Sequence, residues 1–212
     1  MMPKDELSSF QPVPGHPELI QLNFREGEPL KVPLHVYVEL DCKVGMQISE
    51  SFYAQLQVEA EKAQAKERVL RSLSRRALTV RDVTTLLRKQ EVSEAVRDGV
   101  IEDFLAKGLL DDRKYAEMFV AGKARRLSRT EIVWRLSQRG VSKDVAQEAV
   151  RDEHSQEKEF EAAFSLAKKH WKRHEGEESS LRFRKLGAYL QRRGFSMEVI
   201  QLVFNRLSGE IS

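Results

Sequence analysis

Apolar residues recur every three to four positions over most of the chain, which is the spacing of one helical face. The stretch KGLLDDRKYAEMFV, residues 107–120, shows how two such helices join. Gly108 can end one helix and an Asp can begin the next, so only Leu109 and Leu110 are left for the turn. Both are apolar, and we expect both to be buried. A turn this tight between apolar helices predicts a repeated helical unit.

Internal repeats appear when the chain is compared with itself. A shift of 54 residues places 132–150 on 186–204, and a shift of 49 residues recovers a weaker copy around 83–96. The longer shift matches Leu136 with Leu190, Arg139 with Arg193, Gly140 with Gly194, Ser142 with Ser196 and Val145 with Val199. A unit of this size cannot bury both sides of its helices alone, so the copies should stack. The sequence therefore predicts a mainly α fold, in which three tandem three-helix repeats form an elongated curved domain.

A different segment precedes the repeats. We expect 1–60 to be an acidic N-terminal extension, followed by repeat one over 61–110, repeat two over 111–153 and repeat three over 154–212. In the extension, PELIQLNF and EPLKVPL on either side of REGE predict a short β-hairpin, whereas HVYVELDCKVGMQIS fits strand or helix. A helical pattern from Ser49 to about Ala77 predicts a long helix that links the extension to the repeats.

Each repeat carries signals for the ends of its helices. TVRD from Thr79 and SRTE from Ser128 are capping boxes, in which a hydroxyl and a carboxylate three residues later bind free backbone amides. Gly140 and Gly194 suit the left-handed conformation that terminates a helix, and Glu91 takes the equivalent place in the first copy. The third helix of each copy should be capped by Ser93, Ser142 or Ser196.

Composition narrows the class of protein. Of 212 residues, 41% are hydrophobic and 33% are charged, which is enough for a core and favours helix. The chain has no apolar run of about 18 residues and no signal peptide, and its lone Cys42 suits a reducing compartment, so we expect a cytoplasmic protein. Lys and Arg number 4 against 9 Asp and Glu in residues 1–60, 21 against 16 in 61–153, and 11 against 8 in 154–212. The basic repeats are compatible with a polyanion or an acidic protein surface as partner.

Few residues offer catalytic or metal chemistry. Asp111 and Asp112 are adjacent, but paired acid–base work needs two carboxyls facing one substrate across several Å, so helix capping is the better interpretation. His170 and His174 lie four apart, a spacing that can place two imidazoles on one face for Zn²⁺, yet a zinc site also wants a third ligand. We interpret the pair as a solvated helix end. The sequence predicts no enzyme, no catalytic residue, no metal and no cofactor.

Basic residues give the stronger signal. They cluster around the first two helices of repeats two and three, and Arg, whose planar fork suits carboxylates and phosphates, predominates. Trp134 lies nearly opposite the apolar face of its helix, so it either anchors an interface or packs on a neighbouring repeat. A solvated face that keeps a helical protein soluble is the alternative to a binding surface. The predicted partner-binding residues are Lys123, Arg125, Arg126, Arg129, Trp134, Arg135, Arg139, Arg184, Lys185, Arg192 and Arg193, and we expect the arginines near position 125 to be exposed.

Three separated motifs carry a resemblance to a known family. GLLDDRKYAEMFV, IVWRLSQRGV and RRGFSMEVI resemble, in this order, the RecX family of regulatory proteins, which modulate the RecA recombinase. The resemblance covers roughly residues 60 to 207. It implies tandem three-helix repeats, no catalysis, and binding in the groove of the RecA filament to restrain recombinase, ATPase and coprotease activities in DNA repair and the SOS response. Two departures are Glu91, which stands where the other copies have Gly, and the Leu and Ser of RRLSRTE, which stand where many members have glycines.

A direct nucleic-acid-binding protein of helix-turn-helix type is the alternative function. Its recognition helices, such as SKDVAQEAV, are poor in the Arg, Asn and Gln side chains that read bases. We therefore expect at most weak binding to single-stranded DNA. We also expect no membrane partner and a monomeric protein. Whether tight binding needs the recombinase or only DNA distinguishes the two functions.

Overall fold

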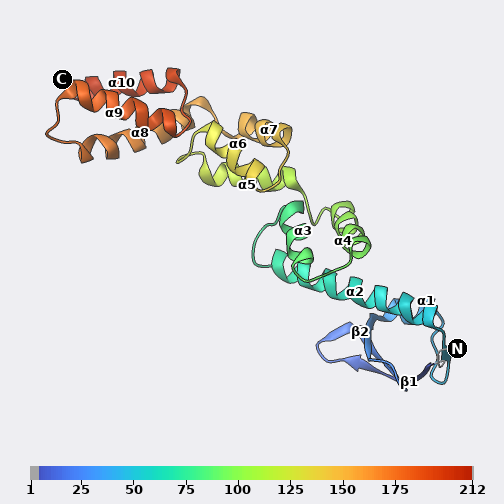
Figure 1. Ribbon diagram of the computed structural model, residues 1–212. Coiled ribbons are helices and arrows are strands. Elements are labelled where there is room, and N and C mark those ends of the chain that lie inside the picture. Colours follow the sequence, from blue (N-terminus) through green and yellow to red (C-terminus); the bar gives the residue numbers. More distant parts are fainter. Residues whose placement is uncertain (1–4, 212) are drawn as a thin grey trace. The chain divides into compact units, whose positions relative to one another are not determined.

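The computed structural model describes residues 5–211, and it is mainly helical, as predicted. Within these residues, strands occur only between positions 5 and 48, and the rest of the regular structure is helical (Figure 1). The chain divides into two compact units. Of the described residues, the first unit holds 5–77 together with 83–109, and the second holds 78–82 together with 110–211.

A four-stranded antiparallel sheet opens the first unit. Its strands are β1 (Asp5–Val13), β2 (His16–Phe24), β3 (Leu30–Pro33) and β4 (Gln47–Ile48), in the order β3-β2-β1-β4. The predicted hairpin is confirmed as β2 and β3. The sequence did not reveal β1, which pairs with β2 and β4. The ambiguous segment contains both structures, since it forms helix α1 (Leu34–Glu39) and strand β4.

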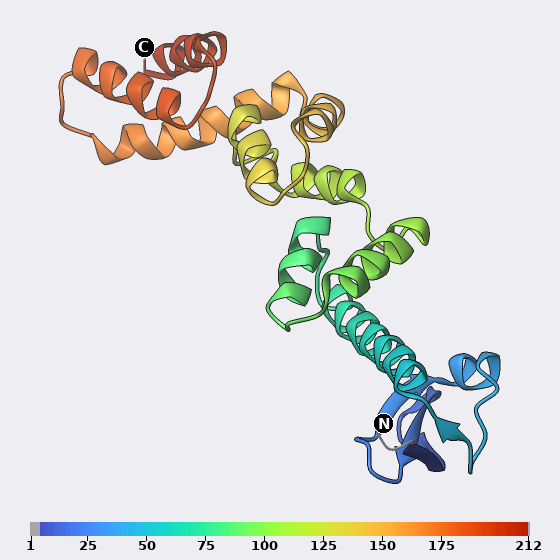
Figure 2. The same cartoon turned by 45° about the vertical axis from the view of Figure 1, so that its right-hand side comes forward.

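Helix α2 (Glu50–Leu73) joins the sheet to the helices of the first unit (Figure 2). Ser49 caps its start by accepting a hydrogen bond from the amide of Phe52, at 3.2 Å. Leu56 and Ala60 in its first half are buried with residues of the sheet, including Leu7, Leu22 and Val32. Its second half contacts α4 (Glu94–Ala106), and there Lys66 lies 2.7 Å from the carboxylate of Asp103.

The second unit contains two three-helix cores. The first core is built from α5 (Asp112–Lys123), α6 (Arg129–Gln138) and α7 (Lys143–Glu153), and the second from α8 (Gln156–Arg173), α9 (Ser179–Arg192) and α10 (Met197–Ile211). The fully buried Ile132 and Leu136 of α6 correspond to Leu186 and Leu190 of α9 across the 54-residue shift. The repeat detected in the sequence is therefore also a repeat of buried positions.

The joint at residues 107–111 corrects one expectation. Gly108 ends α4 with φ of 64°, and the amide of Leu109 then bonds back to the carbonyl of Phe104 at 2.9 Å. Leu110 is 2% exposed, as predicted, but Leu109 is 47% exposed. Consecutive side chains point to opposite sides of an extended chain, and here the side chain of Leu110 is buried while that of Leu109 faces solvent.

Most predicted caps are confirmed. The amide of Asp82 donates to the Thr79 hydroxyl at the start of α3 (Val80–Arg88), and Glu131, Val145 and Val199 donate in the same way to Ser128, Ser142 and Ser196. Ser93 precedes α4 as predicted, but its amide and hydroxyl both donate to the carboxylate of Glu61 on α2. A tertiary contact has replaced the local cap.

Candidate partner-binding face

The same contact between successive repeats occurs at two places in the second unit, and we call each a joint. The contacts at these joints determine which basic side chains remain available to a partner. The Thr79 hydroxyl donates to the carbonyl of Arg139 at 2.8 Å, and the Ser128 hydroxyl donates to the carbonyl of Arg193 at 2.7 Å. A carboxylate from the following repeat accepts the next amide in each case. Asp112 accepts from Val80 at 2.9 Å, and Glu159 accepts from Arg129 at 3.1 Å.

Asp111 and Asp112 both serve helix starts. Asp111 accepts from the amides of Arg113 and Lys114 at the start of its own helix, which confirms the capping interpretation. Asp112 is used at the joint instead, and burial raises the pKa of its carboxyl. The two carboxylates therefore do not face each other across a gap that a substrate could occupy.

Arg129 belongs to the joint between repeats two and three. Its Nε and Nη2 atoms donate to the carbonyl of the fully buried His154 at 3.0 and 2.6 Å, and Nε lies 3.3 Å from the carboxylate of Glu159. Glu159 is itself only 6% exposed. The guanidinium of Arg129 is therefore held by the fold, so charge reversal at Arg129 would damage the joint, and the expected exposure is only partial, since its side chain is 40% exposed.

Four other predicted residues also have partners inside the chain. Arg135 donates to Glu131 at 2.6 Å, and Lys185 donates to Glu177 at 2.7 Å. Arg139 and Arg193 occupy equivalent positions in the repeat. Arg139 lies 4.0 Å from the carboxylate of Asp82 and over the rings of Tyr115 and Phe119. Arg193 lies 3.8 Å from the carboxylate of Glu131 and over the ring of Tyr189. Contacts within and between the repeats thus explain part of the basic pattern.

The remaining predicted cations are exposed. Within residues 5–211, none of them has an ion pair or a side-chain hydrogen bond: Lys123, Arg125, Arg126, Arg184 and Arg192. The first three lie at the end of α5 and in the short connection to α6, and Arg184 and Arg192 lie on α9. We call these five side chains the free cations. Their charge is available to a partner.

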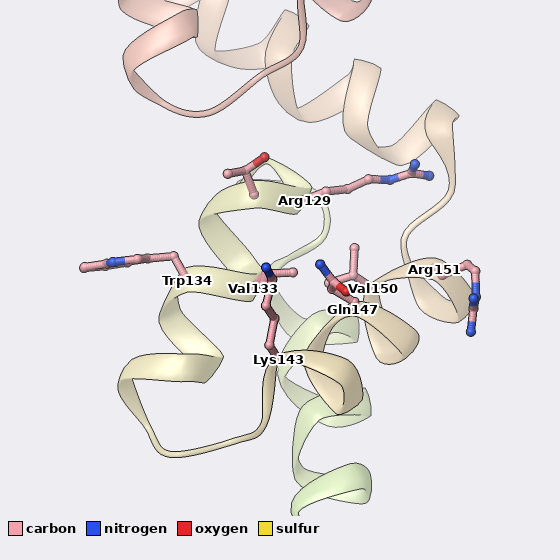
Figure 3. Close-up of a pocket in the computed structure, with 8 residues that line it drawn as sticks. Arg129, Val133, Trp134, Lys143, Gln147, Val150 and Arg151 are labelled. Carbon is pink, nitrogen blue, oxygen red and sulfur yellow. The ribbon is translucent and has the colours of Figure 1, made fainter.

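Trp134 is the aromatic member of this face. It is 61% exposed, while Ile132 and Leu136 on the other side of α6 are fully buried, so Trp134 does not share their core. One hollow, of about 440 Å³, lies between Trp134 and the end of α9, where Arg192, Arg193 and Gly194 line it. A second hollow, of about 520 Å³, lies between α6 and α7 and includes Trp134 at its edge (Figure 3).

Sequence reasoning missed three polar residues of the second hollow. Lys143, Gln147 and Arg151 lie four residues apart on α7 and all line it. Their spacing places them along one face of a helix, and this regularity was the available signal. It was hidden because Asp144, Glu148 and Asp152 alternate with them along the same helix.

Metal and membrane signals are weak in the described residues. No cluster of three or more metal-ligating side chains occurs within residues 5–211. The ring centroids of His170 and His174 are 4.5 Å apart with the rings tilted, His170 stacks on Tyr189, and His174 contacts Glu177 at 3.0 Å. Burial, followed by the nearby His174 and two arginines, lowers the pKa of His170. In the same range, no helix combines the length and hydropathy needed to cross a membrane.

Comparisons with known proteins agree with the motifs. Models of the second and third three-helix domains of RecX match residues 111–150 and 157–204. The regulatory protein RecX of Thermobifida fusca is 33% identical over 136 residues, which cover 63% of this chain and 73% of that protein. The regulatory protein RecX of Caldanaerobacter subterraneus is 28% identical over 167 residues, covering 78% and 82% of the two chains.

Solved structures share the fold. A crystal structure of regulatory protein RecX superimposes with a TM-score of 0.81 at 20% identity, covering 95% of this chain and 99% of that one. RecX from Lactobacillus salivarius superimposes with a TM-score of 0.65 at 22% identity, covering 70% and 97%. The likeness extends over nearly the whole of this chain in the first comparison.

Proposed function

Because the chain belongs to the RecX family, we propose that it binds the filament of a RecA-type recombinase and restrains its ATPase, strand-exchange and coprotease activities. It acts by occupying a surface and has no catalysis or cofactor of its own. The observation that carries the proposal is the coincidence of the exposed Trp134 with the five free cations on the two repeats that match RecX domains.

The proposed contact combines an aromatic anchor with unpaired charge. Interfaces use exposed Trp and Arg as energetic centres, since both supply large contacts with directional hydrogen bonds. Arg125 and Arg126 have no carboxylate partner in the described residues, so binding does not first require an internal ion pair to break. An acidic region on the recombinase would therefore gain charge-assisted contacts here.

Direct DNA recognition ranks second. In a helix-turn-helix protein α7 would be the recognition helix, yet Asp144, Glu148 and Asp152 form a stripe of carboxylates along it. Such a stripe repels phosphates. The basic residues beside it are too few to cancel this repulsion and also to read bases.

Reversal of two free cations tests the proposal. We expect the parent protein to lower the DNA-dependent ATPase of preformed recombinase filaments and to slow strand exchange. Arg125→Glu with Arg126→Glu should weaken this inhibition about tenfold or more, because attraction becomes repulsion at the contact. Arg129 is left unchanged because it holds the joint.

A matched control changes the same charge elsewhere. Lys169→Glu with Lys172→Glu alters two exposed, unpaired lysines of α8, and this variant should inhibit like the parent. Thermal melts establish that both variants are folded. If the parent leaves ATPase and strand exchange unchanged, the functional proposal fails. If the parent inhibits and the variant with Arg125→Glu and Arg126→Glu inhibits equally well, the chosen face is wrong.

A further inference from the structure

The hollow between α6 and α7 has an apolar floor and a basic rim. Val133 and Val150 supply the floor, and Trp134 stands at one side (Figure 3). Lys143 and Arg151 lie at the two ends of the α7 stripe, with the amide of Gln147 between them. No acidic residue lines this hollow within the described part of the chain. Lys143 has no ion pair there, and Arg151 contacts only its exposed neighbour Asp152, at 3.7 Å.

Repeat three shows what fits in the equivalent place. The 54-residue shift replaces Val133 by Gly187 and Val150 by Phe204. The Phe204 ring lies directly over Gly187, since a Cβ atom added to that glycine would be 3.2 Å from Cζ of the ring. The same ring packs edge-on against Phe183 at 5.2 Å. In repeat three the chain itself thus places an aromatic ring where repeat two leaves a hollow.

The basic rim occurs in only one of the three copies. Lys143, Gln147 and Arg151 correspond to Met197, Gln201 and Asn205 in repeat three, which carry no charge. In repeat one the corresponding residues are Glu94, Asp98 and Glu102, which are all acidic. Repeat two therefore combines an empty ring-sized space with positive charge, and neither neighbour does.

We propose that this hollow binds a short extended segment of a protein partner, in which an aromatic side chain lies between two carboxylates. The ring would fill the space that Phe204 fills in repeat three, and the carboxylates would pair with Lys143 and Arg151. Those two residues are eight positions apart on α7, or about 12 Å along the helix axis. An extended chain covers this distance in about four residues, so the carboxylates should lie two residues before and two residues after the ring.

Charge favours a peptide over a nucleic-acid strand. A nucleotide base can also stack on an exposed Trp, but a strand carries its phosphates in unbroken succession. Asp144 and Asp152 are sequence neighbours of Lys143 and Arg151 on α7, so a strand that continued past the hollow would meet negative charge, and Glu148 is already paired with Arg113 at 3.2 Å. A peptide places its two carboxylates only where the two cations are. The inference gives the proposed recombinase contact a specific peptide motif, and it rests on that proposed function only for the identity of the partner.

The test uses the full chain and a blocked peptide of sequence SDSFSDS. Binding is followed through the indole N–H resonances of the two tryptophans, which Trp171→Phe assigns by removing one of them. We expect a saturable shift of the Trp134 resonance, with Trp171 unchanged. The peptides SDSASDS, without the ring, and SKSFSKS, with reversed charge, should each bind about tenfold more weakly or not at all.

Two variants examine the hollow from independent sides. Lys143→Glu with Arg151→Glu reverses the rim at exposed positions and should raise the dissociation constant of SDSFSDS about tenfold or more. Val133→Gly with Val150→Phe copies the repeat-three pair into repeat two, so it should fill the space while leaving every charge in place. Lys169→Glu with Lys172→Glu is again the control and should bind like the parent.

Several results would overturn the inference. They are no saturable shift at millimolar SDSFSDS, equal binding by all variants, a larger Trp134 shift with a short oligo(dT) strand than with the peptide, or self-association that the rim variant abolishes. Filament inhibition separates this inference from the proposed function. If the parent inhibits filaments but does not bind the peptide, only the hollow has been misassigned; if it binds the peptide but never inhibits, the recombinase role fails instead.

Discussion

At the scale of single residues, the glycine at the end of the second helix has two separate roles. Gly140 has φ of 86°, and a Cβ atom there would lie 2.5 Å from the Cβ of Arg81. Gly194 has φ of 79°, and its Cβ would lie 2.9 Å from the Ser128 hydroxyl. Both the left-handed backbone and the close approach of the preceding repeat exclude a side chain. Glu91 meets only the first condition, since its φ is 58° and its side chain is exposed.

Glu91→Gly should therefore stabilise the protein. A left-handed conformation costs a residue with a Cβ atom about 1–2 kcal/mol, and glycine avoids this cost but loses more chain entropy on folding. We expect a net gain of about 0.5–1 kcal/mol in the free energy of unfolding, measured by urea denaturation with unchanged m-value. Equal or lower stability would mean that the Glu91 side chain makes a contribution beyond its backbone conformation.

Asp103 should make stability depend on acid pH. Hydrogen bonds from Lys107 and Lys66 lower its pKa from 3.8 to about 2. A carboxyl with a lowered folded pKa stabilises the fold above its unfolded pKa, and the contribution disappears as pH falls through the folded value. The side chain is 26% exposed, so we expect Asp103→Asn to cost only about 1 kcal/mol at pH 7.

The measurement is urea denaturation of parent and variant between neutral pH and about pH 2. The difference in unfolding free energy should shrink below about pH 4 and be nearly gone at about pH 2. A difference that stays constant over this range would assign the effect to packing and not to the ionised carboxylate.

At the scale of helices and joints, the sequence predicted what depends on neighbouring residues. Helix starts at Thr79, Ser128 and Ser142 and a helix end at Gly140 follow from side chains that bind amides within one turn, or from a backbone conformation that glycine favours. Partners distant in sequence account for what was missed. Ser93 is bound by Glu61, 32 residues away, and Arg129 is bound by His154, 25 residues away.

The Ser128 hydroxyl connects both kinds of contact, so its loss should cost more than the loss of an ordinary cap. It accepts from the amide of Glu131 and donates to the carbonyl of Arg193, and Ser128 is fully buried. Ser142 is exposed and accepts only from Val145. Ser128→Ala should lower the free energy of unfolding by about 2–3 kcal/mol, because it removes the cap and also leaves the partly buried carbonyl of Arg193 without its donor.

Ser142→Ala is the matched control and should cost about 1 kcal/mol, which is the value of a cap alone. Both are measured by urea denaturation. Equal costs for the two serines would show that the bond from Ser128 to Arg193 adds no net stability to the joint.

At the scale of the whole molecule, charge is divided along the chain, and this division was fully visible in the sequence. Residues 1–60 carry 9 acidic against 4 basic side chains, and the excess of Lys and Arg lies beyond them. The number of basic residues nevertheless overestimates the charge available on the proposed binding face, because contacts within the second unit hold Arg129, Arg135, Arg139, Lys185 and Arg193. Only the folded chain separates these from the free cations. The α7 hollow likewise needed the pairing of two helices to become visible.

Binding to naked single-stranded DNA should consequently be weak and governed by salt. Each phosphate neutralised on a single strand contributes about −0.7 to the slope of log K against log salt, so the five free cations give a limit of about −3.5. Arg125→Glu with Arg126→Glu should reduce the magnitude of that slope by at least about 1.4, as measured by fluorescence anisotropy over a salt series.

Binding to recombinase filaments should fall less steeply with salt, because Trp134 adds an apolar contact that salt does not screen. Sequence-specific duplex binding that survives competitor DNA would contradict this and favour a helix-turn-helix reader, since phosphate contacts alone carry no base information.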